Sequence, residues 1–251
     1  MVTFIEVIIL SFIQGITEWF AISSSGHLAI AGELFGVRDL GLVVYLHFAS
    51  VLGVIIYFWK DIINLFAKKD IKYITRVIIS IIPIAVAGIF LEKHVEEAFG
   101  NLFFIGVFFI ICGFFIYSTK YAKEKKTRPS ISDSLYIGFS QILAIFPGIS
   151  RSGMATGSGL ILGLKKEEAI KFSFILAIPI VFGAGILEAG QISTLTLPFY
   201  VLLTSFTITL LTSLLTIMLL VRIIKHDKFY LFGIYNFILG IILILWGLGF
   251  L

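Results

Sequence analysis

The sequence is poor in charge and in cysteine. Only 14% of its 251 residues are charged, against about a quarter in a soluble domain, and 59% are hydrophobic. With a mean hydropathy of +1.08, this composition excludes an ordinary soluble protein and predicts an integral membrane protein. The single cysteine, Cys112, excludes a disulfide within the chain. A basic segment ahead of the first apolar run is also missing, since the first basic residue is Arg38, so no cleaved signal peptide is expected.

Long apolar runs make up most of the chain. Six of them approach or exceed the length of about 20 residues that crosses a bilayer. These runs cover residues 41–59, 74–91, 102–120, 169–188, 197–221 and 229–250. Two further apolar stretches, 1–35 and 131–164, are interrupted by Ser, Gly and charged residues, and interrupted backbone is tolerated at membrane depth only inside protein or beside a wet cavity. The predicted fold class is therefore an all-α integral membrane protein with six transmembrane helices and two re-entrant helix pairs.

Basic residues indicate how the chain lies in the membrane. Most lysines and arginines fall in four clusters, within residues 60–76, 120–128, 165–171 and 222–228. With six spans and two re-entrant pairs, all four clusters lie on one side, which the positive-inside rule makes cytoplasmic. The prediction is a multi-pass protein of the cell membrane with cytoplasmic basic loops and both termini on the outer side. This distribution explains the net charge of +4 without a nucleic-acid partner.

The two interrupted stretches resemble each other. "FIQGITEWFAISSSG" at 12–26 and "FSQILAIFPGISRSG" at 139–153 align at a constant offset of 127 and are identical at six positions. Each copy is followed by three predicted spans, an odd number, so the second half is expected to be inserted upside down. We therefore expect one membrane domain over 1–251, with one half of an inverted repeat at 1–120 and the other at 131–251. The alternative is that both stretches share only the composition of a helix break.

Polar groups suited to phosphate lie at both interruptions. Gln14 and Glu18 are four residues apart and share one helical face, and a carboxylate in an apolar helix needs a partner, a metal or a proton. Arg151 in the second interruption offers a planar fork that matches phosphate oxygens. Small residues around both breaks let backbone N–H groups and hydroxyls face a ligand. The residues expected to bind phosphate beside Arg151 are Ser23, Ser25, Gly26, Gly148, Ser150 and Ser152.

A carboxylate next to a phosphate indicates a bridging divalent cation, because the bare pair would repel. The Glu18 carboxylate and the Gln14 carbonyl suit Mg²⁺ or Ca²⁺. Zinc is not expected, because no cysteine or second histidine lies nearby in the sequence. Ser24, His27 and a water molecule all remain candidates for the attack on phosphorus. His47, in the middle of a predicted span, is interpreted as an interhelical contact, with a supporting position behind the site residues as the alternative.

These residues resemble the motifs of the undecaprenyl-diphosphate phosphatases, also called bacitracin-resistance proteins. Gln14 and Glu18 match (E/Q)-x-x-x-E, and "PGISRS" at 147–152 matches the start of P-G-x-S-R-S-x-x-T. "ISSSGH" at 22–27 matches the stretch that follows the first motif. Two positions depart from the pattern. Ala21 replaces a proline, which should loosen that helix break, and Ala155 replaces the last threonine, with Thr156 one place later.

The resemblance implies hydrolysis of a C55 polyprenyl diphosphate to the monophosphate and inorganic phosphate, which recycles the lipid carrier of cell-wall glycan synthesis. It also implies support by Mg²⁺ or Ca²⁺ and a site open to the outer face. The catalytic residues would then be Glu18, Ser24, His27 and Arg151, with Gln14 and Glu18 on the metal. The expected partners are the lipid substrate and membrane lipid, not nucleic acid, and a homodimer is left open. The alternative is a transporter that flips polyprenyl phosphate through the same site.

Overall fold

Every regular segment in the described part of the chain is a helix. The computed structural model describes residues 3–37, 39–188, 190 and 195–250, and these contain no strand, only an isolated bridge between Lys126 and Leu164. The helices are α1 (Phe4–Thr17), α2 (Ser24–Phe35), α3 (Leu40–Tyr57), α4 (Trp59–Ala67), α5 (Ile71–Phe99), α6 (Leu102–Ser118), η1 (Thr119–Tyr121), α7 (Ile131–Leu143), α8 (Arg151–Ile161), α9 (Lys166–Leu187), α11 (Phe199–Lys225) and α12 (Leu231–Gly247). The predicted all-α class is confirmed.

Among the described residues, five helices are long and apolar enough to cross a membrane. They are α3, α5, α6, α9 and α11, and they coincide with five of the six predicted spans. The sixth predicted span, 229–250, forms α12, which is apolar but has only 17 residues and ends at Gly247. The arrangement of six spans and two re-entrant pairs therefore stays a prediction.

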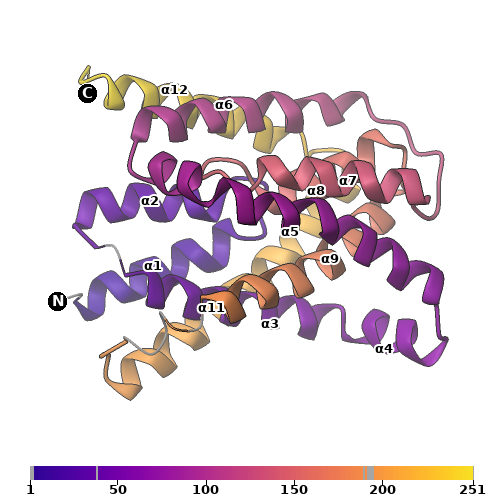
Figure 1. The fold of residues 1–251 in the computed structure, drawn as a ribbon, viewed down its shortest axis with the longest axis horizontal. Helices are drawn as coiled ribbons and strands as arrows, with labels where there is room; N and C mark the ends of the chain where they lie inside the picture. Colours follow the sequence, from indigo (N-terminus) through magenta and orange to yellow (C-terminus); the bar gives the residue numbers. More distant parts are fainter. Residues whose placement is uncertain (1–2, 38, 189, 191–194, 251) are drawn as a thin grey trace.

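Both interrupted stretches are broken where the sequence predicts. The first separates into α1 and α2 around residues 18–23, and the second into α7 and α8 around residues 144–150. In each stretch the second helix folds back beside the first (Figure 1). Neither stretch is one continuous helix, although the proline expected at the first break is Ala21.

The same capping arrangement starts both helix pairs. At α1, Thr3 N–H donates to Glu6 Oε2 (2.7 Å) and Glu6 N–H donates to Thr3 Oγ1 (3.3 Å). At α7, Ser130 N–H donates to Asp133 Oδ2 (2.8 Å) and Asp133 N–H donates to Ser130 Oγ (3.1 Å). Each is a capping box that satisfies two otherwise unpaired backbone donors, with the acid also favouring the positive end of the helix dipole. The two boxes are 127 residues apart, the same offset as in the sequence comparison.

Helices α6 and α12 lie antiparallel, side by side, and glycines of both helices lie at their contact (Figure 1). A Cβ atom at Gly106 would lie 2.7 Å from the Gly240 carbonyl oxygen, and one at Gly113 would lie 2.9 Å from the Gly233 carbonyl oxygen. No real Cβ approaches a backbone oxygen so closely. The helix backbones therefore touch directly, which is the packing that small residues permit in membrane proteins.

Replacing Gly113 by alanine is expected to destabilise the protein by about 1–3 kcal/mol, because the backbone of α12 must move away to admit the methyl group. Gly88→Ala is the matched control, since a Cβ at this helical position would have no described atom within 4 Å apart from its chain neighbours and the nearby backbone of its own helix. It should be neutral or slightly stabilising, because alanine is the better helix former. Thermal unfolding of both variants in detergent measures the difference. Equal midpoints for the two would contradict this packing.

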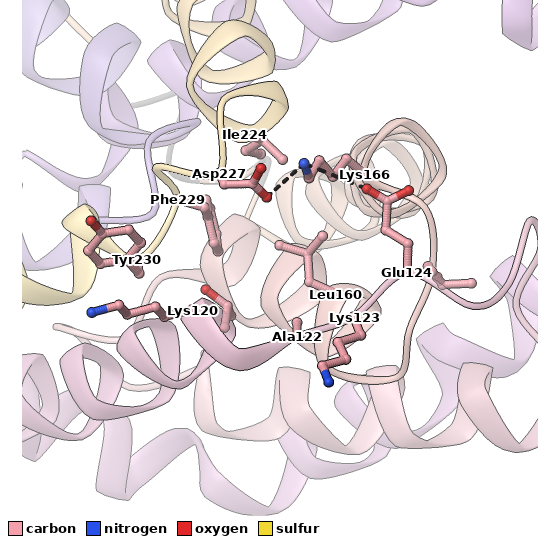
Figure 2. Close-up of a pocket in the computed structure, with 12 residues that line it drawn as sticks. Lys120, Ala122, Lys123, Glu124, Leu160, Lys166, Ile224, Asp227, Phe229 and Tyr230 are labelled. Carbon is pink, nitrogen blue, oxygen red and sulfur yellow. Dashed lines mark ion pairs between the residues drawn. The ribbon is translucent and has the colours of Figure 1, made fainter.

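The four basic clusters lie together at one end of the molecule. Ion pairs join their loops: Lys166 Nζ is 2.7 Å from Asp227 Oδ1 and 3.6 Å from Glu124 Oε1, and Arg128 Nη1 is 2.7 Å from Asp70 Oδ2. A cavity of about 50 Å³ opens between these loops, and Figure 2 shows Lys166 held between Asp227 and Glu124 at its edge. In Figure 1 the chain ends lie opposite the α4–α5 and α6–α7 loops.

Candidate active site

The two helix breaks meet in the interior of the protein. Gly148 N–H donates to Ser23 Oγ (3.0 Å), and Ser152 Oγ donates to the Glu18 carbonyl oxygen (3.1 Å). The Arg151 guanidinium donates from Nη2 to Glu18 Oε1 at 2.7 Å. Residues that lie more than 100 positions apart in the chain therefore form one polar cluster inside an apolar protein.

The Glu18 carboxylate is the centre of this cluster. Its side chain is 4% exposed, against 22% for Arg151, which occupies Oε1. Oε2 accepts hydrogen bonds from Ser24 Oγ at 2.5 Å and from Gln14 Nε2 at 3.1 Å. His47 Nε2 lies 3.3 Å from the same oxygen. One carboxylate thus organises an arginine, a serine, an amide and an imidazole.

Two helices begin at this cluster. Ser23 caps α2 through a hydrogen bond from Gly26 N–H (3.3 Å), and Ser150 caps α8 through one from Gly153 N–H (3.1 Å). Ser24 and Arg151 are the first residues of these helices, so both positive dipole ends point towards the Glu18–Arg151 pair. Helix N-termini favour phosphate oxygens. A phosphate group at this position would meet two of them.

Close backbone approach explains the glycines at the breaks. Gly148 has φ of +102°, which favours glycine, and a Cβ there would lie 2.6 Å from the Ile105 carbonyl oxygen. A Cβ at Gly26 would lie 2.6 Å from the Phe109 ring and 3.1 Å from Gly148 N. Both predicted phosphate-binding glycines therefore also serve to pack the two breaks against each other and against α6.

The serine hydroxyls mainly bind the two breaks together. Ser150 Oγ and Ser152 Oγ lie 3.1 Å apart, and each is 3.4 Å from the Phe20 carbonyl oxygen. Ser25 Oγ is 3.2 Å from Ser23 Oγ, within the first break. Ser24 differs from the other predicted serines, because its hydroxyl contacts the Glu18 carboxylate.

His27 faces away from Glu18 and towards α12. Its Nδ1 is 2.8 Å from the Ser23 carbonyl oxygen, and its Nε2 is 2.7 Å from the Tyr235 hydroxyl. The imidazole also stacks on the Tyr235 ring and meets the edge of Phe109. Both ring nitrogens therefore already have partners, and neither hydrogen-bonds to Glu18 or Arg151.

Two polar residues outside the motifs support the site, and of these the sequence analysis did not single out Asn236. The interhelical contact predicted for His47 is with Glu18 itself, which agrees with the alternative of a supporting position at the site. Asn236 Nδ2 donates to the Ala21 carbonyl oxygen at 2.7 Å and so satisfies backbone that the break leaves unpaired. A lone polar residue within an apolar span was the available signal for both, but it does not identify the partner.

The second departure from the motif also has a defined position. Ala155 is buried, and the displaced hydroxyl of Thr156 is fully buried in α8 without a hydrogen-bond partner among the described residues. The motif has a threonine hydroxyl at position 155. In this protein neither Ala155 nor Thr156 supplies a hydroxyl to Glu18 or Arg151.

The donor atoms in this cluster fit a hard cation that takes its remaining ligands from substrate phosphate and water. Glu18 supplies a carboxylate, and the buried Gln14 Oε1 has no hydrogen-bond partner in the described part of the chain. The described residues contain no group of three His, Cys, Asp or Glu placed to hold a metal. Mg²⁺ commonly binds through one or two carboxylates together with substrate phosphates and water. The cavity in Figure 2 contains none of these donors.

Known proteins match the chain over nearly its whole length. Residues 7–242 match the family model described as bacitracin resistance protein BacA. The undecaprenyl-diphosphatase of Methanococcus vannielii is 41% identical over 249 residues, covering 95% of this chain and 98% of that protein. Those of Thermosipho africanus (37%; 94% and 97% covered) and Bacteroides fragilis (33%; 95% and 96% covered) are also similar.

Proposed function

The chain belongs to the bacitracin resistance protein BacA family, and from this membership we propose that it hydrolyses undecaprenyl diphosphate to undecaprenyl phosphate and inorganic phosphate. The observation that carries the proposal is the buried Glu18–Arg151 pair between two helix N-termini. Burying such a pair costs desolvation that a purely structural contact seldom recovers. A site for charged phosphate gives a reason to retain it.

The residues around the pair have distinct tasks. The Arg151 guanidinium and the N-termini of α2 and α8 bind the phosphoryl oxygens and stabilise the charge that develops on them. Gln14 and Glu18 would hold Mg²⁺ or Ca²⁺, which supplies Lewis-acid polarisation of the diphosphate. Ser23, Ser150 and Ser152 keep the two breaks in register through the hydrogen bonds described above.

Ser24 is the favoured attacking group. Its oxygen forms a bond to the terminal phosphorus while the anhydride P–O bond breaks, undecaprenyl phosphate leaves, and the hydroxyl proton passes to the Glu18 carboxylate 2.5 Å away. Water then forms a bond to this phosphorus, the Ser24 Oγ–P bond breaks, Ser24 takes back the proton from Glu18, and inorganic phosphate leaves. His27 is less suited to the attack, because Ser23 and Tyr235 occupy its two nitrogens.

For the membrane arrangement, the proposal is six spans, with the α1–α2 and α7–α8 pairs re-entrant from opposite sides. The support is the 127-residue offset, which relates the starts of α1 and α7, and of α2 and α8. This relation favours an inverted repeat of residues 1–120 and 131–251. The gathered basic loops support a cytoplasmic location for that end and outer termini, in a cell-membrane protein whose partners are its lipid substrate and membrane lipid.

Ser24→Ala is expected to lower kcat by about 10³-fold or more, because it removes the atom that attacks phosphorus. His27→Gln should lower kcat by less than about 10²-fold, which is the loss expected when a general acid–base group is removed. Steady-state phosphate release measures both, and mass spectrometry of acid-quenched wild type should find a phosphoryl group on Ser24. The opposite ranking of the two variants would assign the attack to His27.

The proposed function itself is tested by phosphate release from undecaprenyl diphosphate with purified protein in detergent and Mg²⁺. We expect stoichiometric undecaprenyl phosphate and inorganic phosphate. The relatives named above are called diphosphatases, so hydrolysis is proposed and lipid flipping is not. Folded protein that moves polyprenyl phosphate between leaflets of vesicles but releases no phosphate would overturn the proposal.

A further inference from the structure

We propose that His47 is a direct ligand of the divalent cation, and that the site consequently binds Mn²⁺ more tightly than Mg²⁺ or Ca²⁺. This inference deepens the proposed function, since it rests on the cation placed at Gln14 and Glu18. It is carried by the contacts of the His47 ring, which the sequence motifs do not include.

The first contact defines where the His47 ring carries its hydrogen. Nδ1 lies 2.8 Å from the Val43 carbonyl oxygen, one helical turn earlier in α3. A carbonyl oxygen can only accept, so Nδ1 is the protonated nitrogen. The neutral ring then presents a lone pair at Nε2. Metal-binding histidines commonly have this arrangement, with the second nitrogen donating to a backbone carbonyl.

The second contact places that lone pair against an anion. His47 Nε2 is 3.3 Å from Glu18 Oε2. A protonated ring would pair with the carboxylate directly, whereas in a neutral ring two acceptors face each other and a cation bound between them makes the contact favourable. Two ligand atoms at right angles on a cation, each about 2.1 Å from it, are about 3 Å apart. The observed separation is close to that of neighbouring ligands.

Further oxygen donors lie beside this pair. Gln14 Oε1 is fully buried without a partner among the described residues, and the Gln14 amide already contacts Glu18 through Nε2. Arg151 occupies Glu18 Oε1, and Oε2 is the oxygen that His47 shares with Ser24 and Gln14. The diphosphate can balance both the guanidinium and a cation, because it carries several negative charges. The donor set is then one nitrogen and two protein oxygens, with phosphate oxygens and water completing it.

The nitrogen donor determines the preference among metals. Carboxylate, carbonyl and water oxygens suit Mg²⁺, Ca²⁺ and Mn²⁺ alike, whereas imidazole favours first-row transition metals. Mn²⁺ accepts both kinds of donor. Without the imidazole the site would have only oxygen ligands, so His47→Gln should largely remove its preference for Mn²⁺ over Mg²⁺.

Pulsed EPR of the detergent-solubilised full chain loaded with Mn²⁺ and a non-hydrolysable prenyl bisphosphonate tests the ligand directly. We expect a coupling from a directly coordinated ¹⁴N nucleus in wild type, which His47→Gln abolishes while weakening Mn²⁺ binding about 10-fold or more. His226→Gln, in the basic α11–α12 loop, is the matched control and should leave both unchanged. If His47→Gln does not fold, ¹⁵N-histidine labelling of wild type must replace the ¹⁴N coupling by a ¹⁵N coupling.

Three results would overturn the inference: bound Mn²⁺ without nitrogen coupling, a coupling that persists in His47→Gln, and equal affinities for Mn²⁺ and Mg²⁺ in wild type. The first would also indicate that a proton, not a metal, bridges His47 and Glu18. Phosphate release with Mg²⁺ is measured separately. Hydrolysis without nitrogen coupling leaves the proposed function standing, whereas nitrogen coupling without hydrolysis supports the metal ligand and removes the proposed function.

Discussion

Arg151→Lys is expected to lower kcat/KM for undecaprenyl diphosphate by about 10²- to 10³-fold, although the positive charge is kept. Arg151 uses Nη2 on Glu18 Oε1, which leaves the other donors of its planar fork for phosphate oxygens. A lysine ammonium is a point charge on a flexible stem and cannot present the same pair of parallel donors. Phosphate release by the purified variant, with its unfolding midpoint recorded beside it, measures the loss.

Arg128→Lys is the matched control for this substitution. Arg128 also forms a 2.7 Å ion pair, with Asp70, but it lies in the basic loop region and is more than half exposed. Its conservative replacement should leave kcat/KM unchanged. An Arg151→Lys enzyme within about threefold of wild type would mean that the guanidinium fork does not bind the reacting phosphate.

Glu18→Gln is expected to abolish measurable turnover, with a loss of about 10³-fold or more, and to destabilise the protein by about 3 kcal/mol. The carboxylate accepts from Arg151, Ser24 and Gln14, and an amide cannot accept at both oxygen positions. The substitution also leaves the Arg151 charge without its partner and removes the proton acceptor of Ser24. Thermal unfolding and phosphate release together record the two losses.

A double variant separates the structural from the catalytic contribution of this carboxylate. Glu18→Gln/Arg151→Gln removes both charges, so it should recover part of the lost stability and none of the activity. Glu167→Gln is the control for the loss of a carboxylate. Glu167 is exposed, and its Oε1 lies 4.0 Å from Lys225 Nζ, so this ion pair contributes little. Activity in the double variant would show that the pair is structural and that the phosphate binds elsewhere.

Local sequence predicted the features that depend on local chemistry. The interruptions at residues 18–23 and 144–150 each end in a serine that caps the next helix, the second also contains Pro147 and Gly148, and the structure has both breaks. The apolar runs likewise predicted the long helices. Their limits were less certain, and α12 is shorter than the run that contains it, because apolar composition continues past the residues that are helical.

Contacts between distant segments explain what local sequence could not predict. Nothing around His47 in α3 indicates that its ring reaches Glu18, since helix packing alone sets which face of α3 meets the first break. The direction of the His27 ring is similarly decided by Tyr235 in α12. His47 is likewise 29 positions from Glu18 in the sequence but 3.3 Å from it in space. Spacing within a motif therefore identified the carboxylate and the arginine but not the full set of donors.

The most direct test of the account is an experimental structure of the protein with a prenyl bisphosphonate bound. We expect its phosphorus atoms between the Arg151 guanidinium and the first turn of α2, within hydrogen-bonding distance of Ser24 and beside Glu18. A bisphosphonate bound instead among the basic loops, in the cavity edged by Lys120 and Lys166, would contradict a phosphate site formed by the two helix breaks.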